Sequence, residues 1–346
     1  MHAEAFIIEM PLRSGYRAAG HQLRSRRGII VQVAADGLSG WGEFVEIPGY
    51  STETVETALS TLLEAPVTHS NPMAVAARRT AELDLEAKVR GISLTALLGG
   101  TPGRVPSGAV VARFGDPAGT LAEASERVAD GYRKIKIKVG PGFDVEPLGE
   151  LRARFPEVSI AADANGAYAP GAVPAAIDEI GLRYLEQPYP PPTDWRAFTE
   201  LRDRLSTPIC LDESITGLPT LRSAIASRAC DVVTVKPARL GGLRQAVAAH
   251  DLAVRAGLST VIGGLLETGI GRAASLALGR LPGFTIPADL SASDRYWERD
   301  LTVPPWALDD GHLAVSDRPG IGVDIDLPYL ETVTVSRHSL PSGTEH

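Results

Sequence analysis

Cysteine is scarce in this chain, which contains two, Cys210 and Cys230, among 346 residues. Both stand in or beside apolar segments that resemble buried strands, where small uncharged side chains are common. Two cysteines cannot supply the disulfide framework that stabilises many small secreted proteins, so that class is disfavoured. The scarcity fits a reducing compartment, and we expect a cytoplasmic protein.

Long apolar runs and blocks of basic residues are also missing. No apolar run approaches the roughly 18 residues of a membrane-spanning helix, and the N-terminus lacks the pattern of a secretory signal. The net charge of −8 argues against a nucleic-acid partner. The seven histidines show no metal-binding spacing, and no phosphate-cradling glycine motif follows the first apolar segment. We therefore expect a small-molecule partner, with no nucleic acid and no membrane, and self-association into a homo-oligomer is left open.

Acid and base residues stand at the ends of a series of short apolar segments. These segments are Ile135–Val139, Val158–Ala162, Leu182–Leu185, Ile209–Leu211 and Val232–Val235. The residues that follow or close them are Lys138, Asp163, Glu186, Asp212 and Lys236, at intervals of 25, 23, 26 and 24 residues. Each interval is about the length of one strand and one helix. Because the C-terminal ends of parallel barrel strands meet at one mouth, we expect these charges to converge there.

Strand-like and helical segments alternate from about Val105 onward, which predicts a parallel sheet. Eight strand candidates, the last at Phe284–Ile286, enclose seven helical segments, of which the third is Ala172–Ile180. This alternation predicts an α/β fold, a (β/α)7β barrel similar to a TIM barrel.

Residues 1–104 have a different pattern, with strand-like segments at Phe6–Met10 and Gly28–Ala34 followed by helical ones. We expect them to form an α+β capping domain, with the barrel at residues 105–304. Short strands and turns return in residues 305–338, which should pack back on the capping domain. The last residues, 339–346, are expected to be disordered.

Asp163, Glu186 and Asp212 are the strongest candidates for a metal site. Carboxylates are common at helix N-termini, so one alone would carry little weight. Three at the ends of successive strands suit a hard divalent cation such as Mg²⁺. Asp212 and its neighbour Glu213 compete for the third place, because adjacent strand residues point to opposite faces. Asp212 directly follows the apolar run, so we assign it to the metal and leave Glu213 behind it as an acceptor.

Lysines on two strands are the candidates for proton transfer. Lys134, Lys136 and Lys138 share one strand face, and a closed barrel has no solvated edge to receive them. Lys138 is nearest the mouth, and Lys136, one layer below, would lower its neighbour's proton affinity by repulsion. Lys134 is expected to be solvated at the strand entrance. If Lys236 merely stood at the start of a helix, the helix dipole would disfavour its cation, and this cost favours a functional role.

Together these groups suit one reaction, the removal of a proton next to a carboxylate. Such a proton is weakly acidic, and its loss leaves a dianionic enediolate. A bound Mg²⁺ stabilises the negative charge as it develops. A lysine that is held partly neutral can accept the proton.

The chain resembles the enolase superfamily, and within it the muconate-lactonizing-enzyme subgroup. The resemblance rests on Lys136-Ile137-Lys138, Asp163-Ala164-Asn165, Glu186-Gln187-Pro188, Asp212-Glu213-Ser214 and Lys236-Pro237-Ala238-Arg239. Gly40-Trp41-Gly42-Glu43 is similar to the family's capping domain, so the resemblance covers nearly the whole chain. Residues 263–272 and 289–297 look like those of o-succinylbenzoate synthases and the related N-acylamino acid racemases.

The resemblance implies an enzyme that uses Mg²⁺, with Mn²⁺ as a substitute, on a small carboxylate substrate. In a synthase, a lyase of menaquinone biosynthesis, Lys138 would take the α-proton of 2-succinyl-6-hydroxy-2,4-cyclohexadiene-1-carboxylate and return it to the departing hydroxide. Lys236 would stabilise the enediolate. In a racemase or dipeptide epimerase the two lysines would act as opposed bases. Ala161 stands where many synthases have arginine, which favours the branch that also has racemase activity. An inactive metal-binding barrel is disfavoured because all five positions are filled.

Three further residues are candidates for supporting or substrate-binding roles. Asn165 points the same way as Asp163 by strand parity, so it would contact the substrate or support the site. Gly263 and Gly264 end the seventh strand. They would form either a tight turn or a close backbone approach to the substrate's distal carboxylate, and the residues alone leave both open.

Overall fold

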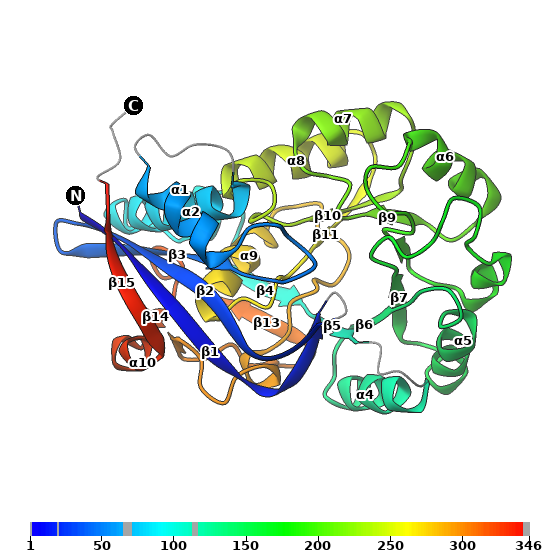
Figure 1. Ribbon diagram of the computed structural model, residues 1–346, viewed down its shortest axis with the longest axis horizontal. Helices are drawn as coiled ribbons and strands as arrows, with labels where there is room; N and C mark the ends of the chain where they lie inside the picture. The colour runs from blue at the N-terminus through cyan, green and yellow to red at the C-terminus, as the bar shows by residue number, and fades with distance from the viewer. Residues whose placement is uncertain (1, 19–20, 65–70, 113–116, 342–346) are drawn as a thin grey trace.

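The computed structural model combines an antiparallel sheet with its helices and a parallel sheet surrounded by further helices (Figure 1). It describes residues 2–18, 21–64, 71–112 and 117–341, with the backbone alone at residues 14–18 and 21–22. In the antiparallel sheet the first strand, β1 (His2–Ala18), pairs with the last, β15 (Thr334–Leu340). Segments from the two ends of the chain therefore lie side by side in one capping sheet.

The capping sheet has the strand order β15-β1-β2-β3, and each neighbouring pair is antiparallel. β2 spans His21–Ala35 and β3 spans Leu38–Val45. Asp36 and Gly37 join them with φ angles of 51° and 79°. A two-residue turn with two positive φ angles matches the right-handed twist of a hairpin, which explains the Asp-Gly pair at this point.

Two helices, α1 (Val55–Leu63) and α2 (Pro72–Val89), follow the sheet and pack against it (Figure 1). Proline at the first position suits α2, because that position has no helical partner for an N–H. Two glycines of β3, Gly40 and Gly42, face α2, and a Cβ at either would overlap the carbonyl oxygens of that helix. The glycines thus allow backbone-to-backbone packing between α2 and the sheet.

The C-terminal part of the chain returns to the capping domain. β13 (His312–Val315) pairs antiparallel with β4 (Gly103–Pro106), in addition to the pairing of β15 with β1. The expectation of disorder from residue 339 is wrong for Ser339 and Leu340, because both continue the ladder of β15. Residues 342–346 lie outside the described residues. The smaller elements are α3 (Leu94–Leu97), β12 (Thr302–Val303), β14 (Asp324–Ile325) and α10 (Leu327–Val333).

Seven parallel strands lie in chain order in the second sheet. They are β5 (Gly108–Val111), β6 (Lys134–Lys138), β7 (Ser159–Asp163), β8 (Leu185–Glu186), β9 (Ile209–Leu211), β10 (Val232–Val235) and β11 (Ser259–Ile262). The strands are buried almost throughout, because helices cover their outer faces and side chains fill the interior. None of the described helices has both the length and the apolar character needed to cross a bilayer.

Helices follow most of the strands of the parallel sheet. They are α4 (Pro117–Ala129), α5 (Val145–Arg154), α6 (Trp195–Arg204), α7 (Leu218–Ala226), α8 (Leu243–Arg255) and α9 (Gly269–Leu278). The helix expected at Ala172–Ile180 is instead a short 3-10 helix over Ala175–Ile180. Pro174 precedes it in an extended conformation and Gly181 ends it in the left-handed region, so only six residues, about two 3-10 turns, fit between them.

The barrel closes without the predicted eighth strand. Phe284–Ile286 forms no ladder, and the closing segment instead makes single parallel bridges at Phe284, Ala288 and Asp289. These bridges connect it to β11 and to Ser107, just before β5. Pro287 interrupts the segment, and because proline has no N–H it breaks a regular ladder. The segment occupies the place of the eighth strand, but the prediction that it forms a regular strand is wrong.

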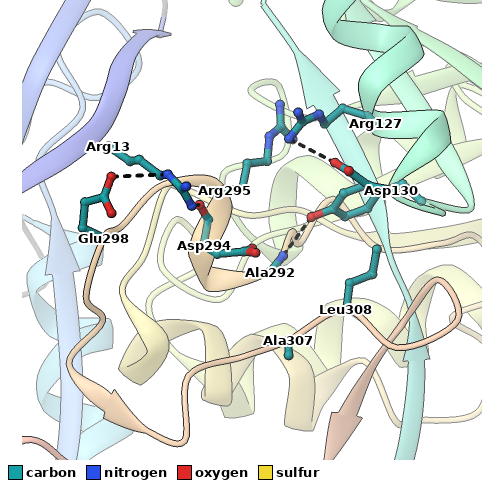
Figure 2. Close-up of a pocket in the computed structure, with 10 residues that line it drawn as sticks. Arg13, Arg127, Asp130, Ala292, Asp294, Arg295, Glu298, Ala307 and Leu308 are labelled. Carbon is teal, nitrogen blue, oxygen red and sulfur yellow. Dashed lines mark hydrogen bonds and ion pairs between the residues drawn. The ribbon is translucent and has the colours of Figure 1, made fainter.

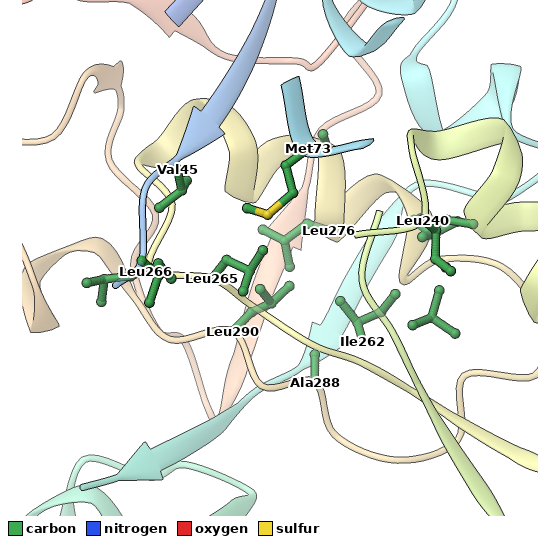
Figure 3. Close-up of a cluster of buried hydrophobic side chains, with 14 of the residues drawn as sticks. Val45, Met73, Leu240, Ile262, Leu265, Leu266, Leu276, Ala288 and Leu290 are labelled. Atoms are coloured by element: carbon green, nitrogen blue, oxygen red, sulfur yellow. The ribbon is translucent and has the colours of Figure 1, made fainter. Parts of the chain in front are cut away.

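An apolar cluster joins the capping domain to the barrel (Figure 3). Val45 at the end of β3 and Met73 in α2 come from the capping side. Leu240, Leu265 and Leu276 come from the barrel, and all five side chains are buried in one continuous core. Burial of such side chains stabilises the association of the two parts by about 1.5–3 kcal/mol for each.

A buried carboxylate makes the most specific contact between the cap and the barrel. Glu43 of β3 accepts hydrogen bonds from Thr268 N and Gly271 N (2.9 Å) at the start of α9, and from Thr268 Oγ1 (2.8 Å). It also forms an ion pair with Arg26 of β2, and both side chains are fully buried. A helix N-terminus favours a negative charge. Glu43 thus neutralises Arg26 and fixes α9 to the cap.

Replacement of Glu43 by alanine is expected to lower the free energy of unfolding by about 3–5 kcal/mol, because Arg26 would be left as an unpaired buried charge. Urea unfolding followed by circular dichroism measures the change. Glu200→Ala is the matched control, since its pair with Arg196 is exposed and should contribute less than about 1 kcal/mol. Equal effects of the two substitutions would show that the Glu43 contact does not stabilise the fold.

Candidate active site

The strand register brings the predicted acid and base residues together at one mouth of the barrel. Asp163 of β7 lies level with Lys138 of β6 on one side and with Glu186 of β8 on the other. Asp212 directly follows β9, and Lys236 directly follows β10. Three strands separate β6 from β10, and β5, the closing segment and β11 lie between them the other way round. The two lysines are therefore on opposite sides of the mouth.

Lys138 is the more accessible of these two lysines, with 29% of its side chain exposed. Its Nζ lies 2.6 Å from Asp163 Oδ2 and 2.6 Å from Asn165 Oδ1. Asn165 has a φ of 43°, a left-handed conformation that asparagine tolerates better than most residues. Its amide donates to Glu213 Oε1 (2.7 Å). Asn165 therefore links Lys138 to Glu213, which supports its expected place in the site.

Lys236 is held on the opposite side by Asp212. Its Nζ lies 2.7 Å from Asp212 Oδ2, and Arg239 forms an ion pair with the other carboxylate oxygen. Burial raises the pKa of the Asp212 carboxyl, but the cations Arg239 and Lys236 outweigh it and hold that pKa below its usual value. Asp212 is therefore a carboxylate at neutral pH.

Glu186 is the most deeply buried of the three predicted metal ligands. Burial, reinforced by the nearby carboxylates Asp163 and Asp212 and opposed by Lys136, raises the pKa of Glu186 to about 8. Its Oε1 has no hydrogen-bond partner within the described ranges. A buried acid with an unpaired oxygen and two acids close by is the donor chemistry that a divalent cation would satisfy.

Each of the three predicted metal-binding acids is paired with a lysine. Within the described part of the chain, no group of three histidine, cysteine, aspartate or glutamate side chains has the geometry of a metal site. Lys138, Lys236 and Lys136 each draw a different carboxylate toward an ammonium group. The residue types still fit a hard cation, so Asp163, Glu186 and Asp212 remain its predicted ligands.

Lys136 and Lys134 form a charged layer below the mouth. Lys136 Nζ lies 2.8 Å from Glu186 Oε2, 2.7 Å from Asp289 Oδ2 and 3.4 Å from Asp163 Oδ2. The expectation that Lys134 is solvated is wrong, because its side chain is fully buried and pairs with Asp289 (2.8 Å). Lys134 lies in the barrel interior below the mouth, and a buried ammonium group there requires an acid partner. Sequence reasoning did not single out Asp289, although it too follows an apolar segment at a strand position.

The glycines Gly263 and Gly264 allow close packing at the end of β11. A Cβ on Gly263 would lie 2.6 Å from Cε of Lys236, and a Cβ on Gly264 would lie 2.7 Å from the carbonyl oxygen of Asp289. Both contacts are too short for any other residue. Gly263 therefore makes room for the stem of Lys236, and the predicted approach of either glycine to a substrate stays a prediction.

A cavity of about 560 Å³ opens between the capping domain and the barrel mouth. Tyr50 and Glu53 line it from the loop after β3, and Asn165, Glu213 and Arg239 line it from the barrel. Burial, followed by repulsion from Asp212 and Asp163, raises the pKa of Glu213. The cavity places polar groups of the predicted site against a space large enough for a small carboxylate.

A second cavity, of about 640 Å³, lies away from this chemistry (Figure 2). Its charged side chains pair with one another, as Arg13 does with Glu298 (3.3 Å) and Arg127 with Asp130 (3.2 Å). None of the predicted site residues lines it, whereas the supporting candidates Asn165 and Glu213 line the cavity at the barrel mouth. We therefore assign the site to the cavity at the barrel mouth, although the other is larger.

Three residues that sequence reasoning did not assign also hold the site. Arg239 pairs with Asp212, and Tyr50 contacts both Arg239 and Lys236. The side-chain oxygen of Gln187 accepts from the backbone N–H groups of Asp212 and Ser214 (3.1 Å each). Arg239 and Gln187 stand within the recognised motifs, which is the one signal that could have found them. Tyr50 is distant in sequence and carried no such signal.

The fold and the site define a barrel enzyme with acid-base groups at the mouth and a separate capping domain. Residues 119–329 match the enolase C-terminal domain-like family, and residues 1–77 match the MenC N-terminal domain family. The chain belongs to the enolase superfamily, which confirms the resemblance and the capped-barrel fold predicted from the sequence.

Similar proteins carry two different names. The chain is 38% identical to an N-succinylamino acid racemase of Thermus thermophilus over 96% of each chain, and 36% identical to an o-succinylbenzoate synthase of Bacillus subtilis over 93% of each. It also resembles the crystal structure of an enolase superfamily member from Listeria innocua, with a TM-score of 0.90, 29% identity and 98% of both chains covered. Identity alone therefore does not separate the synthase from the racemase.

The choice between Asp212 and Glu213 as metal ligand predicts a difference between two substitutions. Asp212→Asn is expected to weaken Mg²⁺ binding by more than about 100-fold, beyond the usual effect of a group that only orients a ligand. Glu213→Gln should have a smaller effect, because Glu213 is hydrogen bonded to Asn165. Calorimetric titration of each variant with Mg²⁺ measures the affinities, after unfolding curves have shown that both are folded. The reverse order would mean that Glu213 is the ligand.

Proposed function

We propose that this protein is an o-succinylbenzoate synthase, a lyase that dehydrates 2-succinyl-6-hydroxy-2,4-cyclohexadiene-1-carboxylate to 2-succinylbenzoate. The observation that carries the proposal is the placement of Lys138 and Lys236 on opposite sides of a mouth that contains three carboxylates. Proteins from Bacillus and Geobacillus that are 36–37% identical to this chain bear the name of this synthase.

Lys138 is the proposed acid and base. In its amine form, Nζ takes the proton from the α-carbon of the substrate, and the resulting ammonium then gives that proton to the departing hydroxyl oxygen, which leaves as water. Both transfers occur on one face of the ring, so the elimination is syn. The partial exposure of Lys138 and its contact with Asn165 at the cavity suit such a role.

Lys236 and the buried acids would manage the charge that this step creates. Lys236 faces the other side of the bound ring, where its cation would stabilise the enediolate. When bound by Asp163, Glu186 and Asp212, Mg²⁺ (or Mn²⁺ as a substitute) would neutralise the substrate carboxylate and make the α-proton more acidic. Lys136 would balance the charge of the acids from below, since it contacts Glu186 and Asp163.

Racemisation of N-succinyl amino acids is the second candidate function, and a specific geometry favours it. Lys138 and Lys236 approach from opposite sides, which is what the removal of a proton on one face and its return on the other require. The relative from Thermus thermophilus bears the name of this racemase. The same two lysines could therefore support both reactions in one site.

The test is a direct assay of the purified protein with Mg²⁺. Formation of the aromatic product from the cyclohexadiene carboxylate would be followed by absorbance, and N-succinyl amino acids in D₂O would be examined for α-deuteration. Dehydration that is much faster than exchange is expected for the synthase. Exchange without dehydration would replace the synthase with the racemase, and inactivity in both assays would contradict both functions.

Lys138→Ala is expected to lower the rate of dehydration by about 10²–10⁴-fold, because it removes the group that transfers the proton. The variant should still unfold cooperatively, since 29% of the Lys138 side chain is exposed and the buried Asp163 keeps Lys136 as a partner at 3.4 Å. Steady-state kinetics and thermal unfolding of the same preparation measure the two quantities. Substantial remaining turnover would remove Lys138 from the mechanism.

A further inference from the structure

Tyr50 brings the capping domain into contact with one of the two lysines. It lies in the loop between β3 and α1, which reaches toward the barrel (Figure 1). Backbone hydrogen bonds from Tyr50 N (3.2 Å) and Ser51 N (3.3 Å) to the carbonyl oxygen of Ile47 form the turn. Gly49, with a φ of 80°, allows this tight turn. The cap thus presents a tyrosine at the barrel mouth.

The phenol of Tyr50 contacts the same two cations that Asp212 binds. Its oxygen accepts from Lys236 Nζ (3.1 Å) and from Arg239 Nη1 (2.5 Å). Lys236 Nζ also lies 4.4 Å from the centre of the tyrosine ring, within the range of a cation–π contact. Lys236 is therefore held between a carboxylate of the barrel and an aromatic ring of the cap.

Lys138 has no equivalent contact with the cap in the part of the chain that the structure describes. Its partners there, Asp163 and Asn165, both belong to the barrel. Among the described residues, the two lysines therefore differ in the domain that contacts them, although both come from strand ends. A change in the loop that carries Tyr50 would reach Lys236 directly and Lys138 only through the fold.

A neutral phenol suits the positioning of a cation that must act on a substrate. A second carboxylate beside Lys236 would compete with an anionic substrate for its charge. A tyrosine oxygen and ring fix the ammonium group without neutralising it. Asp212, by contrast, is shared between Lys236, Arg239 and the predicted metal ion.

We propose that Tyr50 is a positioning residue that fixes the Lys236 ammonium group and so controls the chemistry on one face of the substrate. The proposal rests on the proposed function, in which Lys138 and Lys236 act on opposite faces. It makes the cap a determinant of the balance between the two reactions of the site. Proton exchange at an α-carbon reports the two faces separately, because each enantiomer presents its proton to a different lysine.

The experiment measures the initial rate of α-proton loss from each enantiomer of an N-succinyl amino acid in D₂O with Mg²⁺. Lys236→Ala first identifies the enantiomer that depends on Lys236. Tyr50→Leu is expected to slow exchange of that enantiomer by about tenfold to 100-fold, the usual cost of a misplaced catalytic group, and to change the other less than about twofold. Tyr50→Phe, which keeps the ring but loses the acceptor oxygen, should fall between Tyr50→Leu and the unsubstituted protein.

A matched control and a second readout separate positioning from a structural role. Tyr329→Leu removes another tyrosine whose ring contacts a cation, Arg299 at 4.6 Å, in the C-terminal part of the chain, and should change neither exchange rate. With the synthase substrate, Tyr50→Leu should lower kcat with little change in KM, since the charge of Lys236 acts on the enediolate. Thermal unfolding shows whether each variant is folded.

The possible results distinguish the two proposals. Equal slowing of both enantiomers, or no slowing of either, would overturn the role of Tyr50 and leave the proposed function intact. An increase in KM with unchanged kcat would make Tyr50 a binding residue and would also overturn it. If the unsubstituted protein neither dehydrates nor exchanges its substrates, the proposed function fails, and the role of Tyr50 fails with it.

Discussion

The pairing of buried charges inside the barrel is the constraint on which the rest of the structure depends. Lys136 contacts three carboxylates, and Asp289 is shared between Lys136 and Lys134. A buried charge without a partner costs several kcal/mol, so each lysine and acid in this layer requires the others. The strands can bring so many acids to one mouth only because the lysines of β6 lie beneath them. Chemistry at the mouth thus depends on the charge balance below it.

The capping domain makes two contacts of different kinds with the barrel. Glu43 fixes the start of α9 through a fully buried carboxylate, and Tyr50 contacts Lys236 through a phenol at the mouth. The first contact sets where the cap sits, and the second lets that position influence one lysine. A barrel with two opposed lysines can serve both a dehydration and a racemisation, so the boundary between cap and barrel is where a preference between them can arise.

Much of the fold and the centre of the site could be predicted from the sequence, because both depend on local pattern. Apolar runs with charged ends predict strands, and the regular spacing of Lys138, Asp163 and Glu186 places them side by side once the strands are parallel. The same reasoning failed for the eighth strand, where Pro287 breaks the ladder, and for Lys134, which is buried. Local apolar character was a poor guide to hydrogen bonding in the first case, and a place at the strand entrance was a poor guide to burial in the second.

The sequence by itself determined the order of the elements, and it supplied the candidate catalytic lysines and the candidate acids for a divalent cation, because these follow from neighbours along one chain. Only the tertiary structure decided which distant side chains contact these elements and residues. Tyr50 meets Lys236 across 186 residues of chain, and Glu43 meets Thr268 across 225. Such contacts leave no periodic signal, since they depend on how the capping domain rests on the barrel. The folded arrangement alone therefore assigns partners to these residues.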